Sequence, residues 1–277
     1  MMDILDKIIE NKRKEVASQK QTISLKKMID ANAHNFVRPV YSMRDALANS
    51  QSGIIAEFKR KSPSKGWIFP DAKIEDIAPA YESGGATACS ILTDWDYFGG
   101  THTDLIQARD LVKIPLLRKD FVIDEYQIYQ ARAIGADAIL LIASVLTANE
   151  CLNFAKKAHE LSMNVLLEIH SEKELRCLNQ YIDMLGVNNR NLGTFDVSVD
   201  NSFRLVEKMK KEAGDDQNAP VLVSESGLSD IQTIRELRNA GFQGFLIGEM
   251  FMKTTNPGQT LRQLIEQSLY EKYERPI

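Results

Sequence analysis

The sequence has few cysteines and no cysteine pair at metal-binding spacing. Its three cysteines, Cys89, Cys151 and Cys177, stand far apart among the 277 residues. Disulfide-rich domains and structural zinc sites both need closely spaced cysteines, so neither is predicted. The four histidines also lack the spacing of metal ligands, and His170 is interpreted as a residue at the rim of the fold. We therefore expect no metal site and a reducing, cytoplasmic environment.

The sequence also lacks long apolar runs and an excess of charge. No run of 18 apolar residues occurs, and Asp3 and Asp6 interrupt the first apolar stretch, where a secretory signal would be uninterrupted. The 34 basic and 38 acidic residues leave a formal charge of −4, so no overall field attracts nucleic acid or an anionic membrane. A bound anion would need a local site.

Nucleotide-binding and hydrolase motifs are absent as well. The sequence contains no GxGxxG, HExxH, GxSxG or Walker motif. With 44% hydrophobic and 26% charged residues, the composition is still that of an ordinary globular protein. Any catalysis is therefore expected from lysine and carboxylate side chains.

Eight short β-rich runs alternate with helical segments from residue 53 onward. They cover residues 53–59, 88–93, 115–119, 138–144, 165–169, 184–188, 221–225 and 244–248. Strands joined by helices must run parallel, so eight such units predict one closed (β/α)8 TIM barrel, an α/β fold. An open doubly wound sheet is the alternative, but it would usually carry a GxGxxG loop. A repeated unit is supported by similar sequences, each with a glycine that ends a helix, at residues 84–92, 135–143 and 241–248.

The first 50 residues are predicted to form an N-terminal helical extension of a single domain that spans residues 1–277. Apolar side chains at helical spacing indicate an amphipathic helix over residues 3–19, and its basic run from Lys12 to Lys14 is interpreted as a solvated face. A short helix is expected at residues 42–48. Capping boxes are predicted for Thr147 with Glu150, Ser171 with Glu174, and Ser229 with Gln232.

The C-terminal ends of the predicted strands carry charged and polar side chains. Because the active site of a (β/α)8 barrel lies at these ends, and because side chains alternate along a strand, Glu57 and Lys59 share a face with Ile55. The same spacing gives the candidate catalytic set Glu57, Lys59, Lys119, Glu168, Asn188 and Glu225. Any one of these residues could be an exposed charge at the rim of the barrel. Several charged side chains that face inward from apolar strands lose hydration, and a bound ligand or mutual ion pairing must offset that cost.

Glycines and a basic loop suggest an anionic ligand. Gly227 follows the seventh predicted strand and Gly248 ends the eighth, where barrels commonly bind phosphate through backbone N–H groups. The loop KRKSPSKGW at residues 59–67 holds four basic residues after the first strand. We interpret it as a cationic lid over an acidic substrate.

Seven stretches together resemble the indole-3-glycerol-phosphate synthase family of tryptophan biosynthesis. In order, they are AEFKRKSPSKG at 56–66, ILTDWDYFGG at 91–100, LLRKDF at 116–121, LLEIH at 166–170, GVNNRNL at 186–192, SESGL at 224–228 and LIGEM at 246–250. The resemblance covers nearly the whole chain, including an N-terminal extension that the family places over its active site. It implies a monofunctional carboxy-lyase that uses no cofactor.

The resemblance also implies a reaction and a site. The family converts 1-(2-carboxyphenylamino)-1-deoxyribulose 5-phosphate into indole-3-glycerol phosphate, with loss of carbon dioxide and water. Carried over by motif, Lys119 is implied as the general acid and Glu168 as the base for dehydration. Glu57, Lys59, Asn188 and Glu225 complete the implied catalytic set, and Ser62, Phe98, Phe121, Leu141, Arg190, Ser226, Gly227, Gly248 and Glu249 the implied substrate-binding set. Nearby glutamates favour the charged form of Lys119, so we expect an ammonium donor and not a Schiff-base amine.

Two other functions stay open at this point. A phosphosugar isomerase such as phosphoribosylanthranilate isomerase would need an Asp and Cys pair, which no predicted strand end supplies. A non-catalytic barrel scaffold would have no need of Lys119 and Glu168. The expected partner is a small anionic sugar phosphate, not nucleic acid or a membrane, and we expect a monomer, with weak oligomerisation as the alternative.

Overall fold

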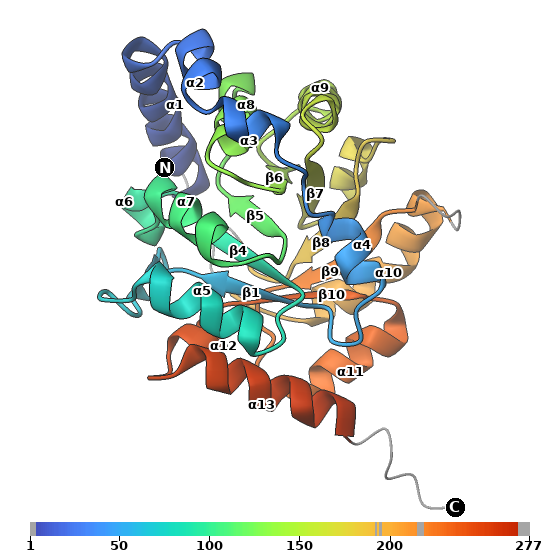
Figure 1. Cartoon of the computed structure of the whole chain (residues 1–277). Coiled ribbons are helices and arrows are strands. Elements are labelled where there is room, and N and C mark those ends of the chain that lie inside the picture. Colours follow the sequence, from blue (N-terminus) through green and yellow to red (C-terminus); the bar gives the residue numbers. More distant parts are fainter. Residues whose placement is uncertain (1–3, 192, 194–195, 215–218, 271–277) are drawn as a thin grey trace, which may run out of the picture.

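A closed barrel of eight parallel strands forms the centre of the computed structural model, which describes residues 4–191, 193, 196–214 and 219–270 (Figure 1). The strands are β1 Ile54–Phe58, β4 Ala88–Leu92, β5 Leu116–Lys119, β6 Ala138–Ile142, β7 Asn164–Ile169, β8 Met184–Asn188, β9 Val221–Glu225 and β10 Gly244–Ile247. Each pairs with the next, and β10 pairs with β1 to close the barrel. The predicted (β/α)8 fold is confirmed, and every strand lies within two residues of its predicted bounds.

Helices cover the outside of the barrel. In chain order, they are α5 Ile74–Ser83, α7 His102–Leu111, α8 Glu125–Ala133, α9 Ala148–Glu160, the 3-10 helix η1 Glu172–Cys177, α10 Asp200–Ala213, α11 Ile231–Ala240 and α13 Pro257–Tyr270. Two short helices, α6 Trp95–Phe98 and α12 Glu249–Met252, and the hairpin of β2 Lys61–Ser62 with β3 Gly66–Trp67 lie in loops after strands. Within the described part of the chain, no helix is long and apolar enough to cross a membrane.

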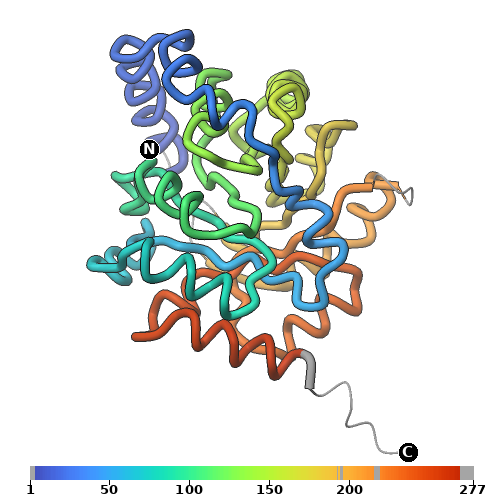
Figure 2. Tube along the Cα trace, in the orientation of Figure 1, coloured from blue at the N-terminus to red at the C-terminus, as the bar shows by residue number. Residues whose placement is uncertain are grey.

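The N-terminal extension runs along one side of the barrel. Its helices are α1 Ile4–Thr22, α2 Leu25–Ala31, α3 Ala33–Val37 and α4 Met43–Ala48. The first three pack against α8, and Figure 2 shows the blue tube then crossing the barrel to α4. Met43 and Leu47 of α4 join the barrel interior beside the first residues of several strands, so α4 closes the end opposite to the active-site mouth. The predicted helices are confirmed; residue 3, where the first was expected to begin, lies outside the described residues.

The core has two layers because side chains alternate along each strand. Ile55, Leu117 and Leu166 fill the barrel interior, whereas their neighbours Ala56 and Leu167 pack toward the helices. The predicted alternation is therefore confirmed. The side chains two residues beyond the interior ones project into the mouth of the barrel, which positions the charged residues at the strand ends.

Two of the predicted capping boxes have opposite outcomes. Thr147 and Glu150 form the reciprocal pair at the start of α9: the Glu150 amide donates to Thr147 Oγ1 at 3.2 Å, and the Thr147 amide donates to Glu150 Oε2 at 2.8 Å. The box at Ser229 is wrong. Helix α11 begins one residue later than expected, and Asp230 is its N-cap, with its side chain accepting from the third helical amide.

The prediction of a solvated basic face on α1 is wrong for Lys12. Its side chain is fully buried, with Nζ 2.9 Å from Asp94 Oδ2 and 3.0 Å from Asp120 Oδ1. Lys14 does lie on the exposed face, where it pairs with Glu10. The difference arises because α1 lies against the loops after β4 and β5, and their carboxylates come from parts of the sequence about a hundred residues away.

Candidate active site

A cavity of about 770 Å³ opens at the C-terminal ends of the strands, a volume typical of small-molecule sites. Of the fifteen predicted site residues, thirteen line it; the exceptions are Glu225 and Leu141. Ile4, Leu5 and Ile8 of α1 also line it. The sequence indicated the apolar face of this helix by its spacing, but the spacing alone did not show what the face covers.

Lys119, at the end of β5, lies between two buried carboxylates. Its Nζ is 3.4 Å from Glu168 Oε2 and donates a hydrogen bond to Glu225 Oε2. Burial alone would lower the pKa of Lys119, but the charges of Glu225, Glu168 and Glu57 outweigh burial and hold the pKa above its usual value. Lys119 is therefore an ammonium at neutral pH, and it has a proton to donate.

Glu225 lies beneath the cavity instead of lining it. Its side chain is fully buried at the end of β9 and contacts Lys119 from below. Burial raises the pKa of Glu225 to about 7, although the Lys119 ammonium opposes the shift. The position exists because residue 186 on β8 is glycine: a Cβ there would come within 2.4 Å of Glu225 Oε1. Glu225 therefore takes up a proton readily near neutral pH.

Glu168, near the end of β7, lies between Lys119 and His170. Its Oε2 faces Lys119, and its Oε1 lies 3.5 Å from His170 Nε2. Burial would raise the pKa of Glu168, but Lys119 and His170 outweigh burial and lower it. The interpretation of His170 as a rim residue missed this contact. The capping hydrogen bond predicted at Ser171 is absent in the described structure, and Glu174 instead accepts from the His170 backbone amide at 2.6 Å.

Glu57, on the interior face of β1, and Lys59, directly after this strand, form an ion pair of 2.7 Å between Lys59 Nζ and Glu57 Oε1. Both line the cavity together with Ser62 of the following hairpin. Gly248 faces them from the end of β10, and a Cβ at this position would come within 2.6 Å of Glu57 Oε1. Glycine at position 248 thus lets the backbone approach the carboxylate closely.

The predicted cationic lid at residues 59–67 is only partly directed at the cavity. Lys59 and Lys65 line the cavity. Arg60 instead binds both carboxylate oxygens of Asp104 on α7, at 2.7 and 2.8 Å, and Lys61 Nζ donates to a backbone carbonyl of α6 at 2.7 Å. Two of the four basic residues therefore fix the hairpin, and the other two face the site.

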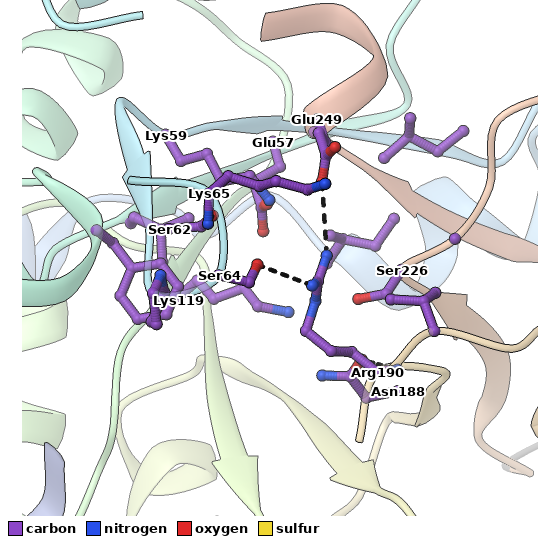
Figure 3. Close-up of a pocket in the computed structure, with 18 of the residues that line it drawn as sticks. Glu57, Lys59, Ser62, Ser64, Lys65, Lys119, Asn188, Arg190, Ser226 and Glu249 are labelled. Atoms are coloured by element: carbon purple, nitrogen blue, oxygen red, sulfur yellow. Dashed lines mark hydrogen bonds and ion pairs between the residues drawn. The ribbon is translucent and has the colours of Figure 1, made fainter. Parts of the chain in front are cut away.

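Arg190, just after β8, reaches across the mouth (Figure 3). Its Nη1 donates to Ser64 Oγ at 3.0 Å, and its Nη2 lies 3.5 Å from Glu249 Oε2. The side chain of Asn188 accepts from the Arg190 amide at 3.0 Å. The other carboxylate oxygen of Glu249 lies 2.5 Å from Lys253 Nζ. These contacts hold the guanidinium at the cavity wall, in a position suited to a carboxylate or phosphate group.

The backbone after β9 has an unusual conformation. Ser226 and Gly227 have φ angles of 67° and 76°, and a left-handed residue other than glycine costs about 1–3 kcal/mol. A Cβ on Gly227 would come within 2.6 Å of Val197 Cγ1. Strain of this kind is commonly found at functional sites, and here it brings backbone to the cavity wall.

Aromatic and aliphatic side chains form the apolar wall. The rings of Phe98 and Phe121 lie 6.2 Å apart, and both line the cavity. The expectation for Leu141 is wrong, because this side chain packs in the layer between the strands and the helices. Its neighbours on β6, Leu140 and Ile142, line the cavity instead, as the alternation of side chains along a strand requires.

The cysteines and metal-binding side chains add nothing to this site. The three cysteines are unpaired and buried, and all belong to the layer that faces the helices. None can serve as an acid or base at the mouth, which the isomerase alternative would require. Within the described ranges, histidine, cysteine and carboxylate side chains form no group of three or more that could hold a metal ion.

Comparisons with known proteins cover nearly the whole chain. A family model described as Indole-3-glycerol phosphate synthase matches residues 5–264. A protein of that name from Bacteroides thetaiotaomicron is 55% identical over 266 residues, which cover 96% of this chain and 99% of the relative. Proteins of the same name from Neisseria gonorrhoeae and Polynucleobacter asymbioticus are 44% and 41% identical, each over 95% of this chain and at least 99% of the relative.

Proposed function

The chain belongs to the indole-3-glycerol phosphate synthase family, and we propose how its barrel mouth performs the reaction. The enzyme is a carboxy-lyase of tryptophan biosynthesis. It converts 1-(2-carboxyphenylamino)-1-deoxyribulose 5-phosphate into indole-3-glycerol phosphate, with release of carbon dioxide and water. The contacts described above support the roles that we propose for individual residues in these steps.

Lys119 is the general acid of ring closure. As the aromatic carbon attacks the ketose carbonyl, negative charge develops on the carbonyl oxygen, and the Lys119 ammonium donates a proton to it. Contact with Glu225 and Glu168 keeps the lysine protonated. Loss of carbon dioxide then restores the aromatic ring.

Glu168 is the base of the final dehydration. Its lowered pKa keeps it ionised, and its Oε2 lies 3.4 Å from Lys119 Nζ, so acid and base act on the same part of the substrate. The Glu168 carboxylate takes a proton from the new five-membered ring and passes it to the departing hydroxyl group, which leaves as water. Glu168 is thereby ionised again, and Lys119 regains its proton from solvent. Glu57 and Asn188 assist from the neighbouring strand ends by pairing with Lys59 and by positioning Arg190.

The two ends of the substrate occupy different walls of the cavity. The phosphate lies near Lys59, Ser62 and the backbone of Gly227, Gly248 and Glu249, where cations and N–H groups are available. The benzoate carboxylate faces Arg190, with Ser226 nearby, and the aromatic ring packs on Phe98 and Phe121. A carboxylate held beside apolar side chains is less well solvated than in water, which favours its loss.

The wider organisation of the enzyme is also part of the proposal. We infer that residues 1–277 act as one domain, as a monomer, in the cytoplasm and without a cofactor. The buried, unpaired cysteines support a reducing compartment. Light scattering after gel filtration tests the monomer, and activity in the presence of a chelator tests the absence of a metal requirement.

The observation that carries the proposal is the contact of Lys119 with both Glu168 and Glu225 inside a cavity of about 770 Å³. The test is to mix the purified chain with the carboxyphenylamino substrate and follow the absorbance and fluorescence of the indole product. We expect indole formation with one carbon dioxide released per indole. A folded protein that produces no indole would contradict the proposal.

A further inference from the structure

Lys12 is buried in an unusual way for a lysine on a surface helix. Its side chain is 1% exposed, and Nζ lies 2.7 Å from Glu15 Oε2, 2.9 Å from Asp94 Oδ2 and 3.0 Å from Asp120 Oδ1. Burial of an ammonium is costly unless several acceptors surround it, and here three carboxylates do. Although burial opposes it, the charges of Asp120, Asp94 and Glu15 raise the pKa of Lys12. The ammonium therefore stays charged inside the protein.

The two distant partners of Lys12 belong to loops that form the active-site wall. Asp120 directly follows Lys119, and its Oδ1 accepts from the amide of Phe121 at 2.8 Å. The other side-chain oxygen of Asp94 caps α6 by accepting from the Tyr97 amide at 2.9 Å. Lys12 thus connects α1 to the loop after β4 and to the segment that carries the general acid.

The same helix covers the cavity one and two turns before Lys12. Ile4, Leu5 and Ile8 line the cavity, and Ile8 belongs to the core layer inside the barrel. Among the described residues, Lys12 is the only residue of α1 that forms buried ion pairs with the loop after β4 and also with the loop after β5. The position of the helix and the placement of the two loop ends therefore share this ammonium.

We propose that Lys12 is a positioning residue, which couples the seating of α1 over the substrate to the placement of the Lys119 and Phe121 segment. It does not touch the reacting atoms. The proposal rests on the proposed function, because it assigns a consequence for substrate binding and turnover at that mouth. It differs from a simple structural anchor, which would change the stability of the protein and leave the kinetics of the folded enzyme unaltered.

The first test is a Lys12→Met variant, assayed well below its unfolding temperature. Loss of the ammonium leaves Asp94 and Asp120 with less compensation, so α1 should be less firmly seated. We expect KM to rise by about 5- to 150-fold, the usual range of coupling between two parts of a protein, with a smaller fall in kcat. Lys14→Met is the matched control: it removes the same charge from the same helix, but its partner Glu10 is exposed, and its kinetics should equal those of the wild type.

A rescue variant separates positioning from general damage. In Asp94→Asn, the retained side-chain oxygen can still cap α6, while the amide replaces the oxygen that faces Lys12. Adding this change to Lys12→Met removes a buried, uncompensated charge, so we expect part of the rise in KM to be reversed. If Lys12→Met does not fold, Asp94→Asn alone should show the same rise in KM to a smaller extent, because Lys12 keeps Asp120 and Glu15.

Hydrogen exchange gives a readout that does not depend on the reaction. The amides of α1 should exchange faster in Lys12→Met than in the wild type or in Lys14→Met. If the wild type forms no indole, the proposed function fails, while faster exchange would still support the coupling. If Lys12→Met lowers the unfolding temperature but leaves KM, kcat and exchange of α1 unchanged, Lys12 is only a structural anchor and the inference is wrong.

Discussion

Three glutamates and two lysines share the mouth of the barrel, so the charge of each depends on its neighbours. Lys59 pairs with Glu57, whereas Lys119 contacts both Glu168 and Glu225. The pKa of Lys119 is raised, and the surplus of negative charge together with burial leaves Glu225 easy to protonate. The two lysines are therefore expected to have different roles.

Replacing Lys119 with Met should abolish proton donation with little change in side-chain volume. We expect kcat to fall by about 10²–10⁴, the usual contribution of general acid catalysis, with KM less affected. Lys59→Met is the comparison, and its main effect should be a higher KM because Lys59 lies at the expected phosphate end. Steady-state kinetics of indole formation measure both. Normal turnover by Lys119→Met would transfer the acid role to Lys59.

Replacing Glu225 with Gln should change how stability depends on pH. The pKa of Glu225 is raised from 4.5 to about 7 in the folded protein, so the folded state holds a proton that the unfolded state releases. The stability due to this group is present at low pH and is lost as pH rises through about 7. Between pH 5 and pH 8, the free energy of unfolding of Glu225→Gln should therefore increase relative to that of the wild type. Denaturant unfolding at several pH values measures this, and parallel curves would rule out the raised pKa.

At the residue scale, the sequence predicted which side chains lie at the barrel mouth better than it predicted which side chains contact one another. The period of two along a strand was enough to place Glu57 and Glu168 at the mouth, because apolar neighbours fixed which face is interior. The same period, applied to β6, points to Leu140 rather than to Leu141, which was carried over from the family resemblance. The burial of Lys12 could not be predicted, because its partners come from distant loops.

At the scale of elements, α1 contributes to the active-site cavity and takes no part in the strand pairing of the barrel. It contributes Ile4, Leu5 and Ile8 to the cavity, whereas the eight strands pair with one another without it. Helix starts were predictable only where the cap is local and unambiguous, as at Thr147. At α11, Ser229 and Asp230 are adjacent capping residues, and only the packing of the helix selects the second.

Removal of residues 1–24 should therefore impair substrate binding more than folding. We expect KM to rise and kcat to fall, while circular dichroism shows a folded barrel with a cooperative thermal transition. Water can reach Asp94 and Asp120 once α1 is absent, so these carboxylates no longer need Lys12. A truncated protein with the KM and kcat of the full chain would show that α1 only packs against the barrel.

At the scale of the whole molecule, one end of the barrel carries the active site and the other end contributes to stability. The strand ends at the mouth carry the charges, whereas α4 closes the other end with Met43 and Leu47, which are fully buried. Barrels of this kind commonly separate catalysis from stability in this way.

A substitution at the closed end should affect stability alone. Leu47→Ala is expected to lower the free energy of unfolding by about 2–5 kcal/mol, since it removes a buried side chain and leaves a cavity. Below the unfolding temperature, kcat and KM should equal those of the wild type. Denaturant unfolding and steady-state kinetics on the same preparation test this, and a changed KM would show that the two ends are coupled.

The central claim is that one mouth carries out two successive steps, with Lys119 as acid in the first and Glu168 as base in the last. Glu168→Gln tests it most directly, because the amide cannot accept the proton but is close in size to the carboxylate. In a single-turnover experiment, the release of carbon dioxide and the formation of indole are timed separately in the wild type and the variant. We predict that carbon dioxide release continues while indole formation is delayed, so that the interval between them lengthens. Equal slowing of both would contradict the assignment and move Glu168 to substrate positioning or to the condensation step.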